Sequence, residues 1–117
     1  MAVVSFAIET LKTHKEKTLI YSWVLANGDT GAPVEMPAFA DRSIQVVGTF
    51  GSGGNLRIQG SNDGTNYATL TDPQGNDLNI TAAKIEQVTE VVRYIRPNVT
   101  AGDGTTNLTV ILLVRRN

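Results

Sequence analysis

Cysteine is absent from the 117-residue sequence, and histidine occurs once, as His14. Without cysteine the chain has no disulfide framework, no thiolate nucleophile and no cysteine-based zinc site. One histidine is too few for a metal centre built on histidines, and a catalytic triad would also need a nucleophile and an orienting acid beside it. We therefore interpret His14 as a solvated surface residue, and we expect no catalytic activity, no cofactor and no metal.

Neither sign of charge is in excess, since 10 Lys and Arg face 11 Asp and Glu, for a net charge of −1. This balance provides no long-range field to attract nucleic acid or an anionic membrane. The longest apolar run, residues 110–114, is far shorter than the roughly 20 residues that span a bilayer. Residues 1–8 are apolar, but no basic residue precedes them and Glu9 follows at once, so we expect no signal peptide. These features predict a partner that is neither nucleic acid nor membrane. Since no catalytic cluster is found, we also expect no small-molecule substrate.

The carboxylates are scattered singly and mostly fall in predicted turns, where Asp usually accepts hydrogen bonds from nearby backbone. Asp63 and Asp77, or the turn at 102–104, could hold calcium, but residues 62–66 lack the terminal glutamate of an EF-hand loop. The glycine-rich residues 51–55 lack the lysine and helix that follow a phosphate-binding loop, so we expect a hairpin loop there.

Alternating apolar and polar residues dominate the stretch from residue 42 to residue 80, and alternation with a period of two indicates strands with one buried face. Turn signals separate these strands at 51–55, 62–64 and 72–75. In the Asn-Asp-Gly turn we expect Gly64 to adopt a positive φ. The pattern predicts a run of short antiparallel strands.

Two further strands, residues 18–26 and 107–116, are apolar on both faces. We expect them to lie centrally and next to each other. A strand that is apolar on both faces must be covered on both faces. Since a small sandwich has little second layer to spare, the second cover could be another subunit, which predicts a homo-oligomer, either a dimer or a trimer.

Three segments have weaker patterns. Residues 32–41 contain two prolines, which favours an edge or a loop, with Val34, Met36 and Phe39 against the core. Residues 81–90 alone have a helical composition and predict one or two helical turns. Residues 91–99 predict a strand that Pro97 restricts to an edge or a bulge.

These segments amount to seven or eight short strands, which is typical of an antiparallel β sandwich. The pattern does not distinguish jelly-roll from immunoglobulin connectivity, although the absence of a Cys…Trp…Cys framework disfavours a true immunoglobulin domain. We expect a sandwich domain over residues 18–117, preceded by an N-terminal arm over residues 1–17, within which residues 2–8 could instead form a short strand. The alternative for residues 9–17 is a solvated linker or a frayed helical turn.

The sequences RIQGSNDGTNYATL at 57–70, RYIRP at 93–97 and GDGTTNLTV at 102–110 resemble the capsid decoration, or cement, proteins of tailed bacteriophages. The resemblance spans residues 44–116. It implies a non-enzymatic, jelly-roll-like β sandwich that forms symmetric oligomers on the virion surface, after synthesis in the host bacterial cytoplasm. Its implied partner is the major capsid protein, bound across the seams between subunits. The predicted contacts with capsid or sister subunits are Val4, Phe6, Ile8, Leu11, Lys12, Lys15, Lys17, Trp23 and Arg93.

Part of the same sequence, Gly60-Ser61-Asn62-Asp63-Gly64 with Tyr67 and then residues 93–96, also resembles discoidin-type sandwiches that bind carbohydrate or lipid. The chain departs from that family because it lacks the cysteine pair of many members and is shorter. Tyr67 and Phe50 are the candidate aromatic residues for stacking on a sugar. A glycan-binding or tail-associated module is therefore the alternative function.

Overall fold

The computed structural model describes residues 2–10, 18–35 and 41–115 of the chain. All of its regular elements are β-strands. They are β1 (Val3–Val4), β2 (Ala7–Thr10), β3 (Thr18–Ala26), β4 (Thr30–Gly31), β5 (Val34–Glu35), β6 (Asp41–Thr49), β7 (Asn55–Ser61), β8 (Ala68–Thr69), β9 (Asn79–Ile80), β10 (Lys84–Gln87), β11 (Tyr94–Ala101) and β12 (Asn107–Arg115). His14, Met36 and Phe39 lie outside the described residues.

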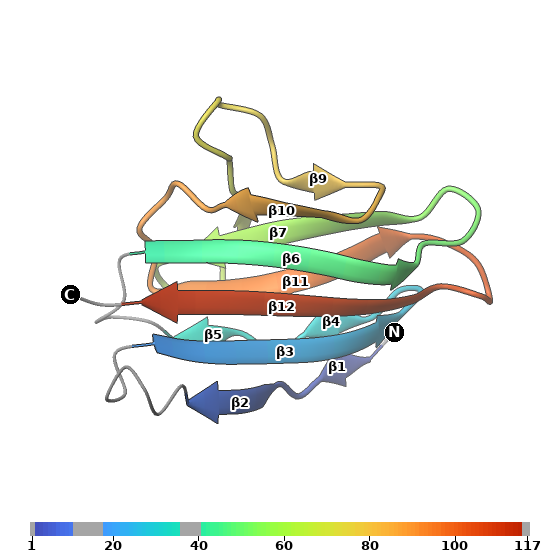
Figure 1. Cartoon of the computed structure of the whole chain (residues 1–117), viewed down its shortest axis with the longest axis horizontal. Helices are drawn as coiled ribbons and strands as arrows, with labels where there is room; N and C mark the ends of the chain where they lie inside the picture. Colours follow the sequence, from blue (N-terminus) through green and yellow to red (C-terminus); the bar gives the residue numbers. More distant parts are fainter. Residues whose placement is uncertain (1, 11–17, 36–40, 116–117) are drawn as a thin grey trace.

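A five-stranded sheet in the order β10-β6-β12-β3-β2 forms one layer (Figure 1). Its middle strand, β12, is antiparallel to both neighbours, and its pairing runs from Asn107 to Arg115 against β3 and against β6. The prediction that the two strands apolar on both faces lie side by side in the centre is confirmed.

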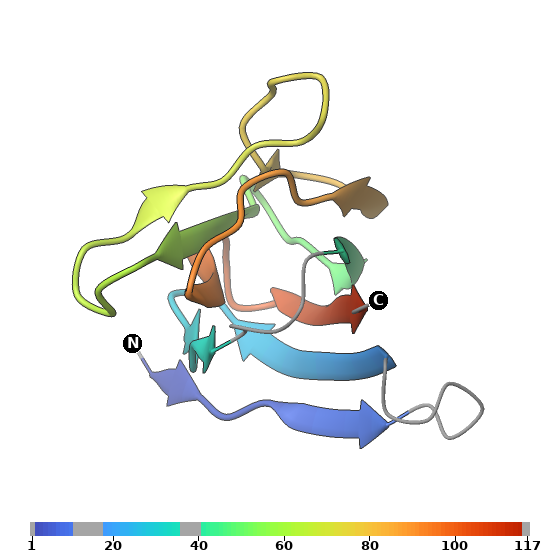
Figure 2. The same cartoon turned by 90° about the vertical axis from the view of Figure 1, so that its left-hand side faces the viewer.

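A seven-stranded sheet forms the second layer, in the order β1-β4-β11-β7-β8, with β5 added to β11 and β9 to β7. In Figure 1 the strands β7 and β11 lie behind β6, β12 and β3, and Figure 2 shows the same layers from one end. Side chains that alternate inward from both sheets fill the space between them, as period-two strands require. The core includes Tyr21, Trp23, Leu25, Ile44, Val46, Leu56, Ile58, Ile95, Val99, Leu108, Val110, Leu112 and Val114. The antiparallel, jelly-roll-like β sandwich expected from the sequence is confirmed; the pairing of β1 with β4 is parallel.

The N-terminal residues that the structure describes belong to both sheets, whereas the sequence predicted an arm separate from the sandwich. β1 pairs with β4, and β2 pairs with β3. Between them, the ring of Phe6 meets Tyr21 and Trp23 edge-on at centroid distances of 5.3 and 6.0 Å. Pairing along the exposed sheet edges satisfies the backbone hydrogen-bonding groups of this apolar segment. Residues 11–17 lie outside the described part, and an adhesive role for the segment stays a prediction.

The helical turns predicted within residues 81–90 are wrong, because this segment forms β10 on the edge of β6. Ile85, which would have anchored a helix, is 60% exposed on the strand. The open edge of β6 supplies backbone hydrogen-bond partners along the segment, and this pairing overrides a weak helical propensity.

The strand predicted over 91–99 is observed as β11, but Pro97 does not lie on a sheet edge. β11 is an interior strand with β7 on one side and the short β4 and β5 on the other. β4 pairs with Asn98 and β5 with Ile95, so neither pairs with Pro97. The missing proline N–H falls in the interruption between two short strands, where no ladder bond requires it. The register shift in β11 comes later, between Val99 and Ala101.

Candidate interaction surfaces

The described part of the chain holds no group of three or more His, Cys, Asp or Glu residues that could bind a metal ion. None of the described segments forms a helix that could cross a membrane. The features that could carry function are therefore two contrasting sheet faces and one surface cavity.

The turn that follows β7 is held by its own polar side chains. Ser61 Oγ accepts the backbone N–H groups of Asp63 and Gly64 at 3.2 and 2.9 Å. The Asp63 carboxylate in turn accepts the N–H groups of Thr65 and Asn66, both at 2.8 Å. These bonds hold the pKa of Asp63 well below its ordinary value, with the backbone bond from Asn66 as the largest cause. The interpretation of Asp63 as a residue that bonds its own turn is confirmed, as is the positive φ of Gly64 (79°).

Two arginine–tyrosine stacks stand beside this turn on the outward side of the seven-stranded sheet. The Arg96 guanidinium lies 3.6 Å from the centroid of the Tyr67 ring, and that of Arg93 lies 5.1 Å from the Tyr94 ring. We name the outward side chains gathered here the Arg–Tyr surface: Arg57, Gln59, Tyr67, Arg93, Tyr94, Arg96 and Asn98.

Three residues apart on a continuous strand, Arg93 and Arg96 would lie on opposite faces, but the structure places them on one surface. Arg93 precedes β11, so the alternation of the strand does not govern its direction. Its Nε bonds Glu35 at 2.6 Å on β5, and its backbone N–H donates to Asn62 Oδ1 at 3.0 Å. These contacts bring its guanidinium to the Tyr94 ring on the same surface as Arg96.

Hydrogen bonds hold the middle of the Arg–Tyr surface in place. Arg96 Nε donates to Gln59 Oε1 at 3.0 Å, on the directly opposed residue of β7. Thr30 Oγ1 donates to Asn98 Oδ1, also at 3.0 Å. Burial, as the largest cause, raises the pKa of Tyr67 above its ordinary value. The result is a surface of rigidly placed planar groups.

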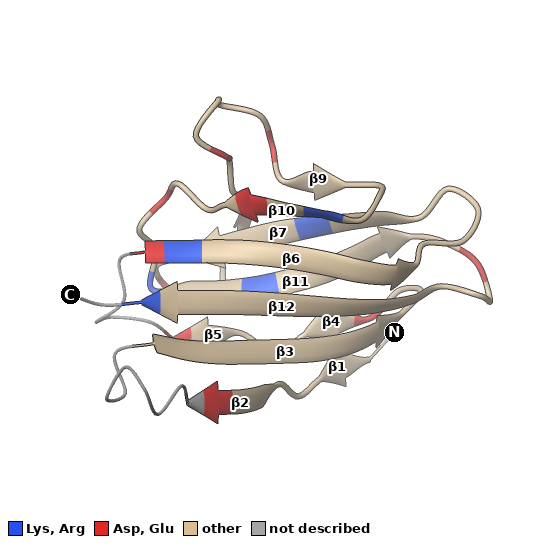
Figure 3. Ribbon diagram, in the orientation of Figure 1, with Lys and Arg blue, Asp and Glu red and all other residues tan. Residues whose placement is uncertain are grey.

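The Arg–Tyr surface carries excess positive charge. Figure 3 shows basic positions on β7 and β11 where these strands pass behind β6 and β12. Glu35 pairs with Arg93, and this bond raises the pKa of the arginine. Within the described part of the chain, no ion pair involves Arg57 or Arg96. The surface therefore offers two guanidinium groups without an ion-pair partner among the described residues to an acidic partner.

The outward side of the five-stranded sheet is apolar instead. Val24 and Ile85 are 59% and 60% exposed there, and Val47 is 37% exposed. Polar but uncharged side chains separate them, including Ser22, Gln45 and Thr109. We name this the apolar face: Ile20, Val24, Val47, Ile85, Ile111 and Leu113.

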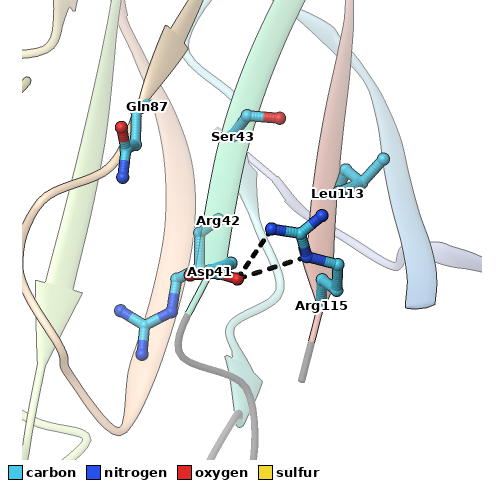
Figure 4. Close-up of a pocket in the computed structure, with 6 residues that line it drawn as sticks. All are labelled: Asp41, Arg42, Ser43, Gln87, Leu113 and Arg115. Atoms are coloured by element: carbon cyan, nitrogen blue, oxygen red, sulfur yellow. Dashed lines mark hydrogen bonds and ion pairs between the residues drawn. The ribbon is translucent and has the colours of Figure 1, made fainter. Parts of the chain in front are cut away.

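A surface cavity of about 330 Å³ marks one end of the apolar face (Figure 4). Its lining is Asp41, Arg42, Ser43, Gln87, Leu113 and Arg115. Arg115 Nη2 pairs with Asp41 Oδ2 at 3.0 Å, so these two charges compensate each other. Arg42 is buried, which lowers its pKa, and its guanidinium donates to the backbone carbonyl of Glu90. The polar groups of the cavity are thus largely engaged with each other and with the backbone.

The residues predicted as contacts are distributed over different environments. Trp23 is 1% exposed and donates its Nε1–H to the Ala32 carbonyl at 3.1 Å, so it lies in the core and not at a surface. Val4 and Phe6 are half-buried, whereas Ile8 and Arg93 are exposed. The predicted contacts Leu11, Lys12, Lys15 and Lys17 lie outside the described residues.

The sequence did not predict the partnership of Tyr67 with Arg96, because no local pattern connects residues on different strands. The sequence did contain a pattern that indicates the apolar face, because the strands at 18–26 and 107–116 are apolar on both sides. In the structure, the chain itself covers one of these two sides with the opposite sheet and leaves the other outward.

No family model matches the sequence, and no curated protein matches it. Several solved structures share its fold. The SPBc2 prophage-derived protein YomS superposes with a TM-score of 0.63 at 10% identity, over 83% of this chain and 93% of YomS. A cupin domain from Bordetella pertussis Tohama I gives 0.56 at 12% identity, over 99% and 96% of the two chains. A cupin superfamily protein from Desulfitobacterium hafniense DCB-2 gives 0.50 at 12% identity, over 96% and 78%. At these identities the similarity shows the fold alone.

Proposed function

We propose that the protein is a non-enzymatic structural protein of a tailed bacteriophage that decorates and stabilises the capsid. It binds across subunits of the major capsid protein on the virion surface, after synthesis in the bacterial cytoplasm. The observation that carries this proposal is the Arg–Tyr surface, with Arg96 stacked on Tyr67 at 3.6 Å. The prophage origin of YomS, which shares the fold, agrees with a phage protein.

The composition of this surface suits a protein partner. Arginine and tyrosine are enriched among the residues that dominate binding energy at protein interfaces, and lysine is depleted there. Small-molecule sites are concave, whereas these side chains lie along the outward side of β7 and β11. Because Gln59 and Tyr67 already hold Arg96, its ordering on binding costs less conformational entropy.

The positive charge of the Arg–Tyr surface predicts that the capsid subunit presents an acidic area to it. Guanidinium groups pair with carboxylates through two parallel hydrogen bonds, which fixes orientation as well as adding energy. Charges at such an interface raise the association rate and make it sensitive to ionic strength. We therefore expect capsid binding to weaken as salt is added.

Co-sedimentation with empty shells of the same phage's major capsid protein tests the proposal. Arg96→Glu reverses charge at the centre of the surface and should reduce binding at least tenfold, because it places a carboxylate against an acidic partner. Lys84→Glu is the matched control, since Lys84 lies on β10 and pairs with Glu86, away from the Arg–Tyr surface. The proposal would be contradicted if the shells did not bind the unaltered protein, or if they bound Arg96→Glu with the same affinity as the unaltered protein.

The N-terminal segment adds a second proposed contact. Its lysines, Lys12, Lys15 and Lys17, would meet acidic groups on the capsid, while exposed Ile8 supplies an apolar contact. Replacing the three lysines by serine should weaken shell binding and leave the melting temperature unchanged. If this variant binds shells with the same affinity as the unaltered protein, these lysines do not contribute to the interface.

The alternative function, binding of a glycan by a discoidin-like or tail-associated module, is favoured by one observation. Tyr67 and Tyr94 flank the same Ser61–Asn66 turn, where Cβ added at Gly64 would lie 3.2 Å from Tyr94. Retention on agarose columns bearing mannose, galactose or N-acetylglucosamine tests this function. Retention that Tyr67→Ala abolishes, together with no binding to shells, would establish the alternative in place of capsid decoration.

A further inference from the structure

We propose that the apolar face of the five-stranded sheet binds a second copy of this chain, so that two sandwiches pack face to face around a two-fold axis. The dimer is inferred from the face itself and does not depend on the proposed capsid function. In this dimer the second copy covers the side of β3 and β12 that faces outward in a single chain.

The distribution of charge on this face is that of a protein interface. Its centre, over β12 and the neighbouring positions of β3 and β6, carries only apolar and uncharged polar side chains. Charged residues stand at its margin: Glu9 on the edge strand β2, and the Asp41–Arg115 pair at one end. Depletion of charge at the centre with a polar rim distinguishes protein interfaces from ordinary surface.

The area of the face is large enough for a specific dimer. Its three central strands have nine residues each and its two edge strands have four each. At about 3.4 Å per residue and about 4.8 Å between strands, the face covers roughly 500 Å². Two such faces bury roughly 1,000 Å² in total, which is about the size at which a specific interface becomes plausible.

The position of β12 suits two-fold symmetry. It is the middle strand of the sheet, and Ile111 is its middle residue, so a two-fold axis in the plane of contact brings Ile111 onto Ile111 of the second copy. Val24 and Val47 lie level with each other on either side, since both pair with Thr109. When the axis runs along β12, Val24 of one copy covers Val47 of the other. The face is therefore complementary to itself.

Dimer formation would leave both Arg–Tyr surfaces accessible, because they lie on the opposite sheet. The two surfaces would point away from each other. On the basis of the proposed capsid function, a dimer of this shape could lie between two neighbouring capsid subunits and contact each with one surface. Two weak contacts would then act together with an avidity that neither has alone.

Sedimentation velocity at tens of micromolar tests the dimer with matched variants. Val24→Glu buries a carboxylate in the proposed interface, whereas Val91→Glu makes the same change at an exposed valine before β11, outside the apolar face. We expect dimers for the unaltered protein and for Val91→Glu, and monomers for Val24→Glu. A monomeric unaltered protein, or a Val24→Glu variant that remains a dimer, would overturn the proposal.

Cross-linking gives a second test that does not depend on a charge substitution. Because the chain has no cysteine, Ile111→Cys and Asn79→Cys each introduce a single thiol. Facing sheets lie about 10 Å apart, so a bismaleimide of that reach should link two copies of Ile111→Cys. Asn79 is exposed on β9 of the opposite sheet and should give only monomer. Equal cross-linking of both variants, or none of Ile111→Cys, would contradict the face-to-face arrangement.

The two proposals fail separately. Arg96→Glu should remain a dimer while it loses shell binding, and Val24→Glu should be monomeric while it keeps a weakened, salt-sensitive affinity for shells. If the protein is a dimer that never binds shells, the proposed function is wrong and the dimer stands. If the unaltered protein is monomeric and still binds shells, the dimer is wrong and the proposed function stands.

Discussion

Replacing Phe6 by alanine tests whether the N-terminal segment is part of the sandwich or a detached arm. Phe6 lies between β1 and β2 and meets Tyr21 and Trp23 edge-on, at 5.3 and 6.0 Å. Each such ring contact is worth about 0.5–1.5 kcal/mol beyond burial. Truncating a fully buried Phe costs about 3–5 kcal/mol. Since Phe6 is only half-buried, we expect Phe6→Ala to lower the free energy of unfolding by about 1.5–2.5 kcal/mol.

Urea denaturation followed by tryptophan fluorescence suits this test, because Trp23 is the only tryptophan and lies against Phe6. All variants are compared at one protein concentration, since association would contribute to the apparent stability. The denaturation midpoint should fall with the slope unchanged. For a chain of this size the melting temperature should fall by about 6–10 °C. The native emission should also shift to longer wavelength, because truncation admits water beside the indole.

Val3→Ala is the control, since Val3 lies on β1 but is 74% exposed. We expect it to change the free energy of unfolding by less than about 0.5 kcal/mol. If Phe6→Ala has as small an effect as Val3→Ala, the segment does not pack on the sandwich in solution. The detached arm expected from the sequence would then be correct, and the pairing of β2 with β3 would not.

Three further predictions concern the turns and the core. Gly64→Val should lower the free energy of unfolding by roughly 1–3 kcal/mol, because φ is 79° and an added Cβ would lie 3.2 Å from Tyr94. Gly104→Val is the control, since a Cβ added at Gly104 meets no atom within 4 Å. Equal urea midpoints for the two variants would refute the strain at Gly64. Leu112→Ala should lower the free energy of unfolding by about 2–5 kcal/mol, since this side chain is fully buried between the sheets. A smaller decrease would show that neighbouring side chains fill the space left by the substitution. The pKa of Asp63 is lowered by folding, so its contribution to stability is complete above its ordinary pKa of 3.8 and is lost as pH falls through the folded value. Asp63→Asn should therefore be less stable than the unaltered protein at pH 7, and the difference should shrink in urea titrations below about pH 4; a constant difference would refute the assignment.

The sequence by itself determined the long strands β3, β6, β7, β11 and β12 and the turns that follow β6 and β7. Alternation of apolar and polar residues is a local pattern, and it identified the inward positions of β6 and β7 correctly. The positive φ of Gly64 follows from its own turn, because the steric constraint and the hydrogen bonds of Asp63 act within a few residues. The central pairing of β3 with β12 also followed, since strands apolar on both faces cannot lie at a solvated edge.

Contacts between distant segments were decided only by the tertiary structure. The composition of residues 81–90 favours a helix, but the unpaired edge of β6 offers backbone partners that a helical turn of this length cannot outweigh. Pro97 lies in an interior strand because β4 and β5 happen to leave a gap beside it. Docking of β2 against β3 likewise depends on an edge that no local pattern of residues 7–10 reveals.

The candidate surfaces divide in the same way. The apolar face was implied by sequence, because residues on both sides of β3 and β12 are apolar, although which side would remain outward depended on where the second sheet packs. The Arg–Tyr surface was not implied, because Arg96 and Tyr67 meet only once β11 has paired with β7 in one particular register. A shift of one residue would turn Arg96 to the other face of the sheet. Strand pairing, which depends on the packing of the whole chain, therefore decided which side chains form that surface.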